Sequence, residues 1–197
     1  SGTNNTALGY GALKAFTTGT ANTVMGYDAG KEITTGGNNV FIGYQAGESS
    51  TDTSNTISIG QGAGRDGDLG DYTTIMGVYA GLNSTGASNV LVGYKAGFAI
   101  GSTTHTVLIG AEAAAASLTT DANGTVAIGN QALKVLTSGI GNTAIGYQTL
   151  VAEDDGDYNT AVGYQALTAQ TGNSGEVGNT AVGYQAGKAI TTGIRNT

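Results

Sequence analysis

The stretch Asn-Thr-Ala-Val-Gly-Tyr-Gln-Ala occupies residues 159–166 and recurs unchanged at residues 179–186. Altered copies of this phrase run through the whole chain, each centred on one glycine that we number as position 0 of its repeat. The eleven anchor glycines are Gly9, Gly26, Gly43, Gly60, Gly77, Gly93, Gly110, Gly129, Gly146, Gly163 and Gly183. Eight of the ten intervals between them are 16 or 17 residues, and the other two are 19 and 20. A fixed period of this kind is typical of stacked-unit architectures.

A period near 17 residues is too short for a helix pair or a propeller blade, but it can hold one coil of a β-solenoid with two short strands, each followed by a turn. We therefore predict an all-β fold: a parallel β-solenoid (β-roll) of eleven coils of about 17 residues, forming one repeat domain over residues 1–197. Coils stacked about 4.8 Å apart would make a rod roughly 50 Å long. The run Ala113 to Ala116 is the best place for a helical turn, and we expect an ordinary turn even there.

The two ends of the chain lie inside repeats. It opens on Ser1-Gly2-Thr3-Asn4-Asn5 and closes on Asn196-Thr197, the first two residues of a twelfth phrase. We therefore expect a segment of a longer repetitive chain, and we expect copies to associate end to end because neither end carries a polar cap.

The composition excludes several classes of function. Glycine is abundant (35 residues), Pro, Cys and Trp are absent, and charged residues make up 11% of the chain, well below the usual quarter. A net charge of −7 with seven dispersed basic residues gives no footprint for nucleic acid. No apolar run approaches the ~20 residues of a membrane span, and the lack of cysteine removes disulfides and thiolate metal sites. Yet the residue before every anchor glycine is aliphatic or Met, a regularity that disordered chains lack.

Each position of the repeat predicts a column along the rod. Position −4 is Asn in seven repeats and Thr in four, which predicts an inside ladder of amides hydrogen-bonded from coil to coil. Positions −3 and −1 are apolar or Thr and share one side of a strand, which we assign to the interior. Position +3 is Ala in ten of eleven repeats, with Thr149 the exception, and it predicts a tightly packed interior column.

Position −2 then faces outward, although ten of its eleven residues are apolar. An apolar stripe of this length needs a cover, and other copies of the chain supply one, as a homotrimer. The residues predicted at this interface are Phe41, Ile75, Leu91, Leu108, Ala144, Ala161 and Ala181. The smaller residues of the last four repeats would bring the chains closer together there. The alternative is that inside and outside are reversed at this strand.

Two phrases, Asn142-Thr143-Ala144-Ile145-Gly146 and Thr125-Val126-Ala127-Ile128-Gly129, resemble the head repeats of YadA-type trimeric autotransporter adhesins. The fuller phrase, with Tyr-Gln-Ala after the glycine, is also similar to repeats of phage tail fibres and large bacterial surface proteins. The resemblance covers essentially the whole chain and implies a β-roll with three chains around one axis. The present coil is slightly longer than the adhesin coil, and the resemblance does not extend to a neck, coiled-coil stalk or membrane anchor.

The sequence offers little chemistry. His105 is the single histidine, and its place five residues before an anchor glycine predicts a solvated turn rather than a catalytic base. We expect no enzyme activity and no cofactor. Carboxylates on glycine-containing turns can bind Ca²⁺, so Asp68, Asp71, Asp154 and Asp157 are metal candidates, although solvated turns explain them more simply.

Three functions remain. The first is a structural or adhesive segment of an extracellular fibre on a cell surface or virion, with itself and a host-surface glycan or protein as partners. The second is an ice-binding solenoid, because Thr recurs at position +8 in seven repeats. The third, a carbohydrate-processing enzyme, lacks a visible carboxylate pair. The two longest intervals place extra residues at 118–124 and 170–178, which we predict to be loops that either carry recognition or are neutral insertions.

Overall fold

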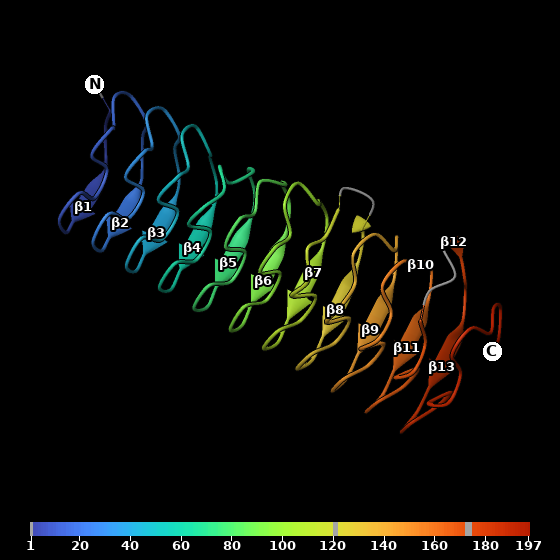
Figure 1. Cartoon of the computed structure of the whole chain (residues 1–197). Coiled ribbons are helices and arrows are strands. Elements are labelled where there is room, and N and C mark those ends of the chain that lie inside the picture. Colours follow the sequence, from blue (N-terminus) through green and yellow to red (C-terminus); the bar gives the residue numbers. More distant parts are fainter. Residues whose placement is uncertain (1, 120–121, 172–174) are drawn as a thin grey trace.

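The protein is a straight stack of coils with the two termini at opposite ends of a rod (Figure 1). The structure is a computed structural model and describes residues 2–119, 122–171 and 175–197. Parts of both predicted loops, residues 120–121 and 172–174, lie outside the described residues. Within the described residues there is no α-helix, and residues 113–116 form a turn, as predicted.

One strand of each coil joins an eleven-stranded parallel sheet in the order β1-β2-β3-β4-β5-β6-β7-β8-β9-β11-β13. These strands are β1 (Thr6–Leu8), β2 (Thr23–Met25), β3 (Val40–Ile42), β4 (Ile57–Ile59), β5 (Thr74–Met76), β6 (Val90–Val92), β7 (Val107–Ile109), β8 (Val126–Ile128), β9 (Thr143–Ile145), β11 (Thr160–Val162) and β13 (Thr180–Val182). A small second sheet pairs β10 (Gly156–Asp157) with β12 (Gly175–Glu176). Every pairing aligns position −2 with position −2, for example Leu91 with Leu108. The prediction of a parallel solenoid with one coil per phrase is confirmed.

The expectation of two strands in every coil is wrong. Beyond the anchor glycine the backbone visits the left-handed region twice, as at Gln165 (φ 52°) and Leu167 (φ 48°). These residues interrupt the extended conformation, so the far side of each coil is a series of turns. The turns still bond along the rod: the Gln165 N–H donates to the Tyr147 carbonyl at 2.9 Å, and the Leu167 N–H donates to the Ala186 carbonyl at 3.0 Å.

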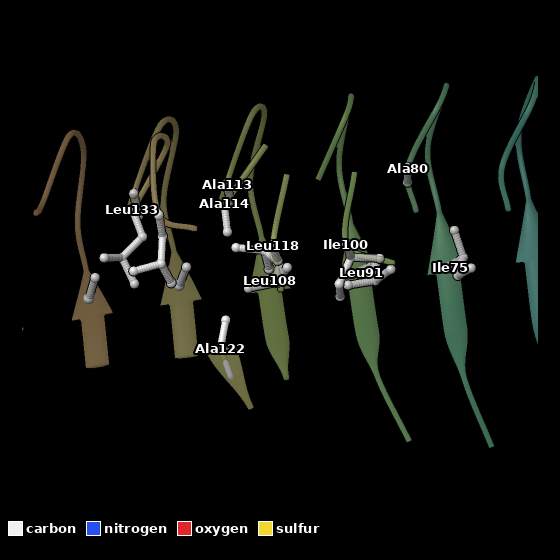
Figure 2. Packing of buried hydrophobic residues seen from close by; sticks show 14 of the residues in the cluster. Ile75, Ala80, Leu91, Ile100, Leu108, Ala113, Ala114, Leu118, Ala122 and Leu133 are labelled. Atoms are coloured by element: carbon white, nitrogen blue, oxygen red, sulfur yellow. The ribbon is translucent and has the colours of Figure 1, made fainter. Parts of the chain in front are cut away.

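The side chains at position −2 point into the coil, so our assignment of inside and outside was reversed. The residues predicted at a chain-to-chain interface are buried in the chain's own core: Phe41, Ile75, Leu91, Leu108, Ala144, Ala161 and, at 8% exposure, Ala181. Figure 2 shows Leu91 beside Ile100, and Leu108 beside Leu118, in the coil interior. Position +3 is buried as predicted in the inner coils, for instance at Ala80. The two positions face each other across a narrow coil, and positions −3 and −1 are therefore on the outside.

Residue size at position −2 is balanced by residue size at position +4. Where position −2 is large, position +4 is often glycine: a Cβ added to Gly81 would lie 2.6 Å from Leu91 Cδ1. In the coils where position −2 is Ala127, Ala144 or Ala161, a buried leucine stands at position +4 instead, namely Leu133, Leu150 and Leu167. Interiors require near-constant packed volume, so the small residues of the later coils reflect core filling and not a closer approach of chains.

The predicted asparagine ladder is confirmed. The Asn39 N–H donates to Asn22 Oδ1 at 3.0 Å, and the Thr56 N–H donates to Asn39 Oδ1 at 3.0 Å. The same amide also bonds within its own coil, since Asn39 Nδ2 donates to the Thr53 carbonyl at 2.7 Å. Asn39 is fully buried, and a buried amide with these partners is a structural element, because its polar atoms satisfy backbone groups of two successive coils.

Candidate functional site

The outer face of the main sheet is a long, flat, uncharged surface. It consists of two columns, position −3 with Thr, Val or Ile, and position −1 with Leu, Met, Ile or Val. We call it the sheet face. Its most exposed apolar residues are Leu8, Met25, Ile57, Met76, Ile145 and Val182. With eleven strands at ~4.8 Å spacing and a width of roughly 10 Å, it covers on the order of 500 Å². Position −3 is Thr in six of the eleven coils, so the apolar part of this area is the unbroken column at position −1. Exposed apolar patches of a few hundred Å² are often functional.

A column of tyrosines at position +1 borders the sheet face. Tyr10, Tyr27 and Tyr44 stack with ring centroids 5.2 and 5.3 Å apart and interplanar angles of 17° and 12°. Tyr147, Tyr164 and Tyr184 form a second stack with spacings of 5.2 and 5.6 Å. We call these stacks the tyrosine edge. Asp28, partial burial and the neighbouring tyrosines raise the pKa of the Tyr27 hydroxyl.

Position +2 carries a glutamine ladder in the C-terminal half. Gln148 Nε2 donates to Gln131 Oε1 at 2.9 Å, Gln165 Nε2 donates to Gln148 Oε1 at 3.0 Å, and Gln185 Nε2 donates to Gln165 Oε1 at 3.1 Å. Each amide donates to its neighbour toward the N-terminus, and stacked amides of this kind stiffen a parallel sheet. Next to Gln131, Glu112 accepts from Gln131 and pairs with Lys134 at 2.8 Å. These two hydrogen bonds, Lys134 first, lower the pKa of Glu112.

Three of the four aspartates that the sequence proposed as calcium ligands accept hydrogen bonds from the preceding coil. Asp68 accepts from the N–H and the hydroxyl of Thr51, both at 2.8 Å. Asp71 accepts from the Ser54 N–H, and Asp157 accepts from the Ile140 N–H, each at 2.8 Å. These carboxylates therefore continue the coil-to-coil bonding at turns.

The fourth candidate, Asp154, lies in a cluster with Glu153 and Asp155, whose carboxylate oxygens are all within 4.8 Å of one another. Glu153 is fully buried, and its Oε1 accepts the N–H groups of Asp154 and Gly156 at 3.2 and 2.8 Å. Burial, above all, raises the pKa of the Glu153 and Asp155 carboxyls. In the described part of the chain no group of three potential ligands includes Asp68, Asp71 or Asp157. Glu153 thus serves the backbone of its own turn.

His105 occupies an exposed turn with a φ of 59°, in agreement with the sequence. Its Nδ1 lies 2.9 Å from the hydroxyl of Thr104, the preceding residue, and that hydroxyl donates to Asn123 Oδ1 at 3.2 Å. The threonines at position +8 likewise use their hydroxyls along the rod. Thr17 Oγ1 donates to the Thr34 carbonyl at 2.8 Å, and Thr137 Oγ1 donates to the Asp154 carbonyl at 2.9 Å.

The sequence analysis missed one surface pocket, of about 250 Å³, lined by Arg65, Tyr79, Leu82, Lys95 and Phe98. A signal for it existed in the repeat. Position +2 is glutamine in the C-terminal coils, but it is Gly62, Tyr79 and Lys95 in three successive central coils. Where a regular column is interrupted, the local shape of the surface differs from that of the other coils.

Comparison of the chain with protein-family models, with curated proteins and with solved structures found no match. In the residues that the structure describes, no helix is long and apolar enough to cross a membrane. The surfaces described above are therefore the basis for assigning a function.

Proposed function

We propose that this chain is a non-enzymatic structural and adhesive segment of an extracellular fibre on a cell surface or virion. Copies of the chain, three in the arrangement implied by the resemblance to adhesin heads, associate side by side through the sheet face. The tyrosine edge borders each contact, and the turns of the outer side are left for a host-surface glycan or protein.

The observation that carries the proposal is the exposed apolar sheet face. A sheet with one face on its own core normally has polar residues on the other, whereas here position −1 is aliphatic or Met in all eleven coils and neither outer column contains a charged residue. The face itself, on the order of 500 Å², is smaller than the ~800 Å² per partner of a standard interface. The contact between chains therefore extends onto the tyrosine edge, whose rings add apolar area.

A parallel solenoid also suits a fibre mechanically. Each coil bonds to the next through strand pairs, the asparagine ladder and the turn hydrogen bonds, so bending the rod strains several bond columns together. β1 and β13 each have one strand partner in the main sheet, and the Thr180 N–H of β13 also donates to the Asn196 carbonyl at 2.7 Å. Association end to end through these strands stays a prediction.

The test is the mass of the chain in solution. We expect light scattering at micromolar concentration to give an oligomer. Val92→Lys and Ile109→Lys, which place charges on the sheet face in β6 and β7, should give a monomer with an unchanged far-UV circular dichroism spectrum. Asn83→Lys, at an exposed turn residue, should leave the mass unchanged. A monomeric wild-type chain, or an oligomer that tolerates both lysines, would overturn the proposal.

Ice binding is the second candidate, and the regular threonine column at position +8 favours it. Several hydroxyl hydrogens of that column are used in coil-to-coil bonds, as at Thr34, which donates to the Thr51 carbonyl at 3.1 Å. These hydroxyls keep only their acceptor sites for water. Thermal hysteresis of the purified chain would favour this function over the fibre, and its absence at millimolar concentration would remove it.

A further inference from the structure

The pocket found above lies where three central coils depart from the repeat. Tyr79 and Lys95 come from position +2, while Arg65, Leu82 and Phe98 come from position +5, so the two columns form its two walls. All five side chains are half-buried, which leaves each with a surface that a ligand can contact.

Gly62 creates the room for the aromatic wall. A Cβ at this position would lie 2.7 and 2.8 Å from Tyr79 Cδ1 and Cε1, so the Tyr79 ring rests against the backbone where other coils carry a side chain. Its hydroxyl accepts a hydrogen bond from Gln61 Nε2 at 3.2 Å. The ring is therefore held in one orientation before any ligand arrives, which reduces the entropy cost of binding.

Two cationic side chains, Arg65 and Lys95, line the pocket of this acidic chain. Arg65 is paired with Asp66, and the pKa of the Glu112 carboxyl in the next coil is lowered mainly by Lys134 and also by Lys95. Lys95 Nζ lies 5.3 Å from the ring centre of Tyr94 and 5.2 Å from that of Phe98, contacts that hold a cation in place. Among the described residues no carboxylate lies within ion-pair distance of Lys95, whereas Lys31 and Lys134 each pair with a glutamate. Arg65 binds Asp66 through Nε and Nη2 at 2.6 and 3.0 Å. This pair uses two of the five guanidinium N–H donors and leaves three.

We propose that this pocket binds an acidic sugar, a uronic or sialic acid unit of a surface glycan. The carboxylate of the sugar pairs with Lys95 and shares the remaining donors of Arg65, while the C–H face of the sugar ring lies against Tyr79, Leu82 and Phe98. The volume of about 250 Å³ is below the ~300 to 1,000 Å³ of pockets for drug-sized ligands, which suits one monosaccharide. A neutral sugar cannot form the ion pair with Lys95. A simple carboxylate has no sugar ring to pack against the apolar side chains of the pocket.

This inference names the partner of the proposed fibre segment and in that sense rests on the proposed function. Because the pocket belongs to a single chain, its ligand can be tested independently of assembly. If the chain is a monomer that binds the sugar, the proposed fibre assembly is wrong but the sugar-binding pocket is supported. If the chain is an oligomer that does not bind the sugar, only the assignment of the pocket is wrong.

The experiment is saturation-transfer-difference NMR with the full chain and four probes: methyl glucuronide, a methyl sialoside, methyl glucoside and acetate. The first two are the acidic sugars to be distinguished. We expect ring-proton saturation for at least one acidic sugar, and a dissociation constant at least tenfold lower than that of methyl glucoside. Lys95→Met should weaken binding of the acidic sugar at least about tenfold, the loss expected for one charge-assisted hydrogen bond. Lys14→Met, which removes an exposed lysine of the first coil, is the control and should bind like the wild type.

Circular dichroism will confirm that both variants are folded, as expected for substitutions at the surface. Tyr79→Leu gives a second measurement, because it keeps the charge and removes the aromatic wall; it should weaken the acidic sugar several-fold and leave acetate unaffected. The assignment would be overturned if neither acidic sugar bound more tightly than methyl glucoside, if Lys95→Met bound the acidic sugar as well as the wild type, or if acetate bound as tightly as the acidic sugar.

Discussion

Replacing an anchor glycine in the middle of the rod should disrupt the stack more than any surface change. The anchor glycines have φ between 130° and 144°, a region that residues with a Cβ avoid. A Cβ on Gly93 would also lie 2.6 Å from the Gly110 carbonyl oxygen and 2.7 Å from its carbon. Ordinary contact begins at 3.4 Å, so in Gly93→Ala the next coil must move by roughly 0.8 Å against its own strand pairing.

The size of the effect follows from two contributions. The unfavourable backbone conformation costs about 1 to 3 kcal/mol, and the forced shift of the next coil costs about 1 to 3 kcal/mol. Gly101 in the same coil separates them, because its φ is 56° and the nearest atom to an added Cβ is the Leu118 carbonyl oxygen at 3.6 Å. Gly101→Ala should therefore cost only the ~1 to 2 kcal/mol of a left-handed residue.

The assay is urea unfolding of both variants, followed by far-UV circular dichroism at a fixed protein concentration. We expect Gly93→Ala to lose at least about twice as much unfolding free energy as Gly101→Ala, or to be unfolded outright, since single domains have only ~5 to 15 kcal/mol in total. If the two variants lose the same stability within ~0.5 kcal/mol, then close contact between anchor glycines does not hold the coils together.

Three further changes test the interior. Leu108→Ala should lower the free energy of unfolding by about 2 to 5 kcal/mol at every protein concentration, because the side chain is buried in its own chain. If this loss disappeared on dilution, the Leu108 side chain would lie at a contact between chains instead. Asn39→Ala leaves two buried backbone groups without partners and should lose at least about 2 kcal/mol in urea unfolding, against ~0.5 kcal/mol or less for exposed Asn83→Ala; equal losses would contradict the ladder. Burial raises the folded-state pKa of Glu153, so the wild type should lose stability as pH rises from the unfolded-state pKa through the folded-state pKa. Glu153→Gln replaces the carboxyl with the amide that Gln170 provides at the same position of the next coil. This variant should therefore have a higher melting temperature than the wild type at pH 7, and its melting temperature should rise less on acidification. A lower melting temperature at pH 7 would contradict this prediction.

Much of the fold could be predicted from the repeat alone. The period gives one coil per phrase, and the column of Asn or Thr at position −4 predicts the ladder that Asn22 and Asn39 form. Identical residues at identical positions can only stack if the coils are parallel and in register, so these features follow from local chemistry repeated along the chain. The small residue at position +3 was assigned correctly to the interior for the same reason.

The candidate site was predicted less well. Asp68, Asp71 and Asp157 were weak metal candidates, for which solvated turns were the simpler explanation, and in the structure each carboxylate accepts from a backbone N–H of the preceding coil. That N–H belongs to a residue 17 positions earlier, and its orientation depends on a left-handed turn that the sequence does not specify. The pocket around Lys95 was missed because its five residues are spread over three coils and form a site only when the coils are stacked.

The sequence by itself determined the period, the parallel register and the columns of like residues, because each of these is set by spacing along the chain. The tertiary structure alone decided which side of the strand is inside. Alternation places Leu91 opposite to Val90 and Val92, but all three are apolar, so hydrophobicity cannot choose between them. The choice is made by packing volume: Leu91 fits the space that Gly81 leaves, and the leucines at position +4 fill the space beside Ala127, Ala144 and Ala161. Positions −2 and +4 together hold at most one large side chain per coil, and the residues at positions −3 and −1 face outward, where they form the sheet face.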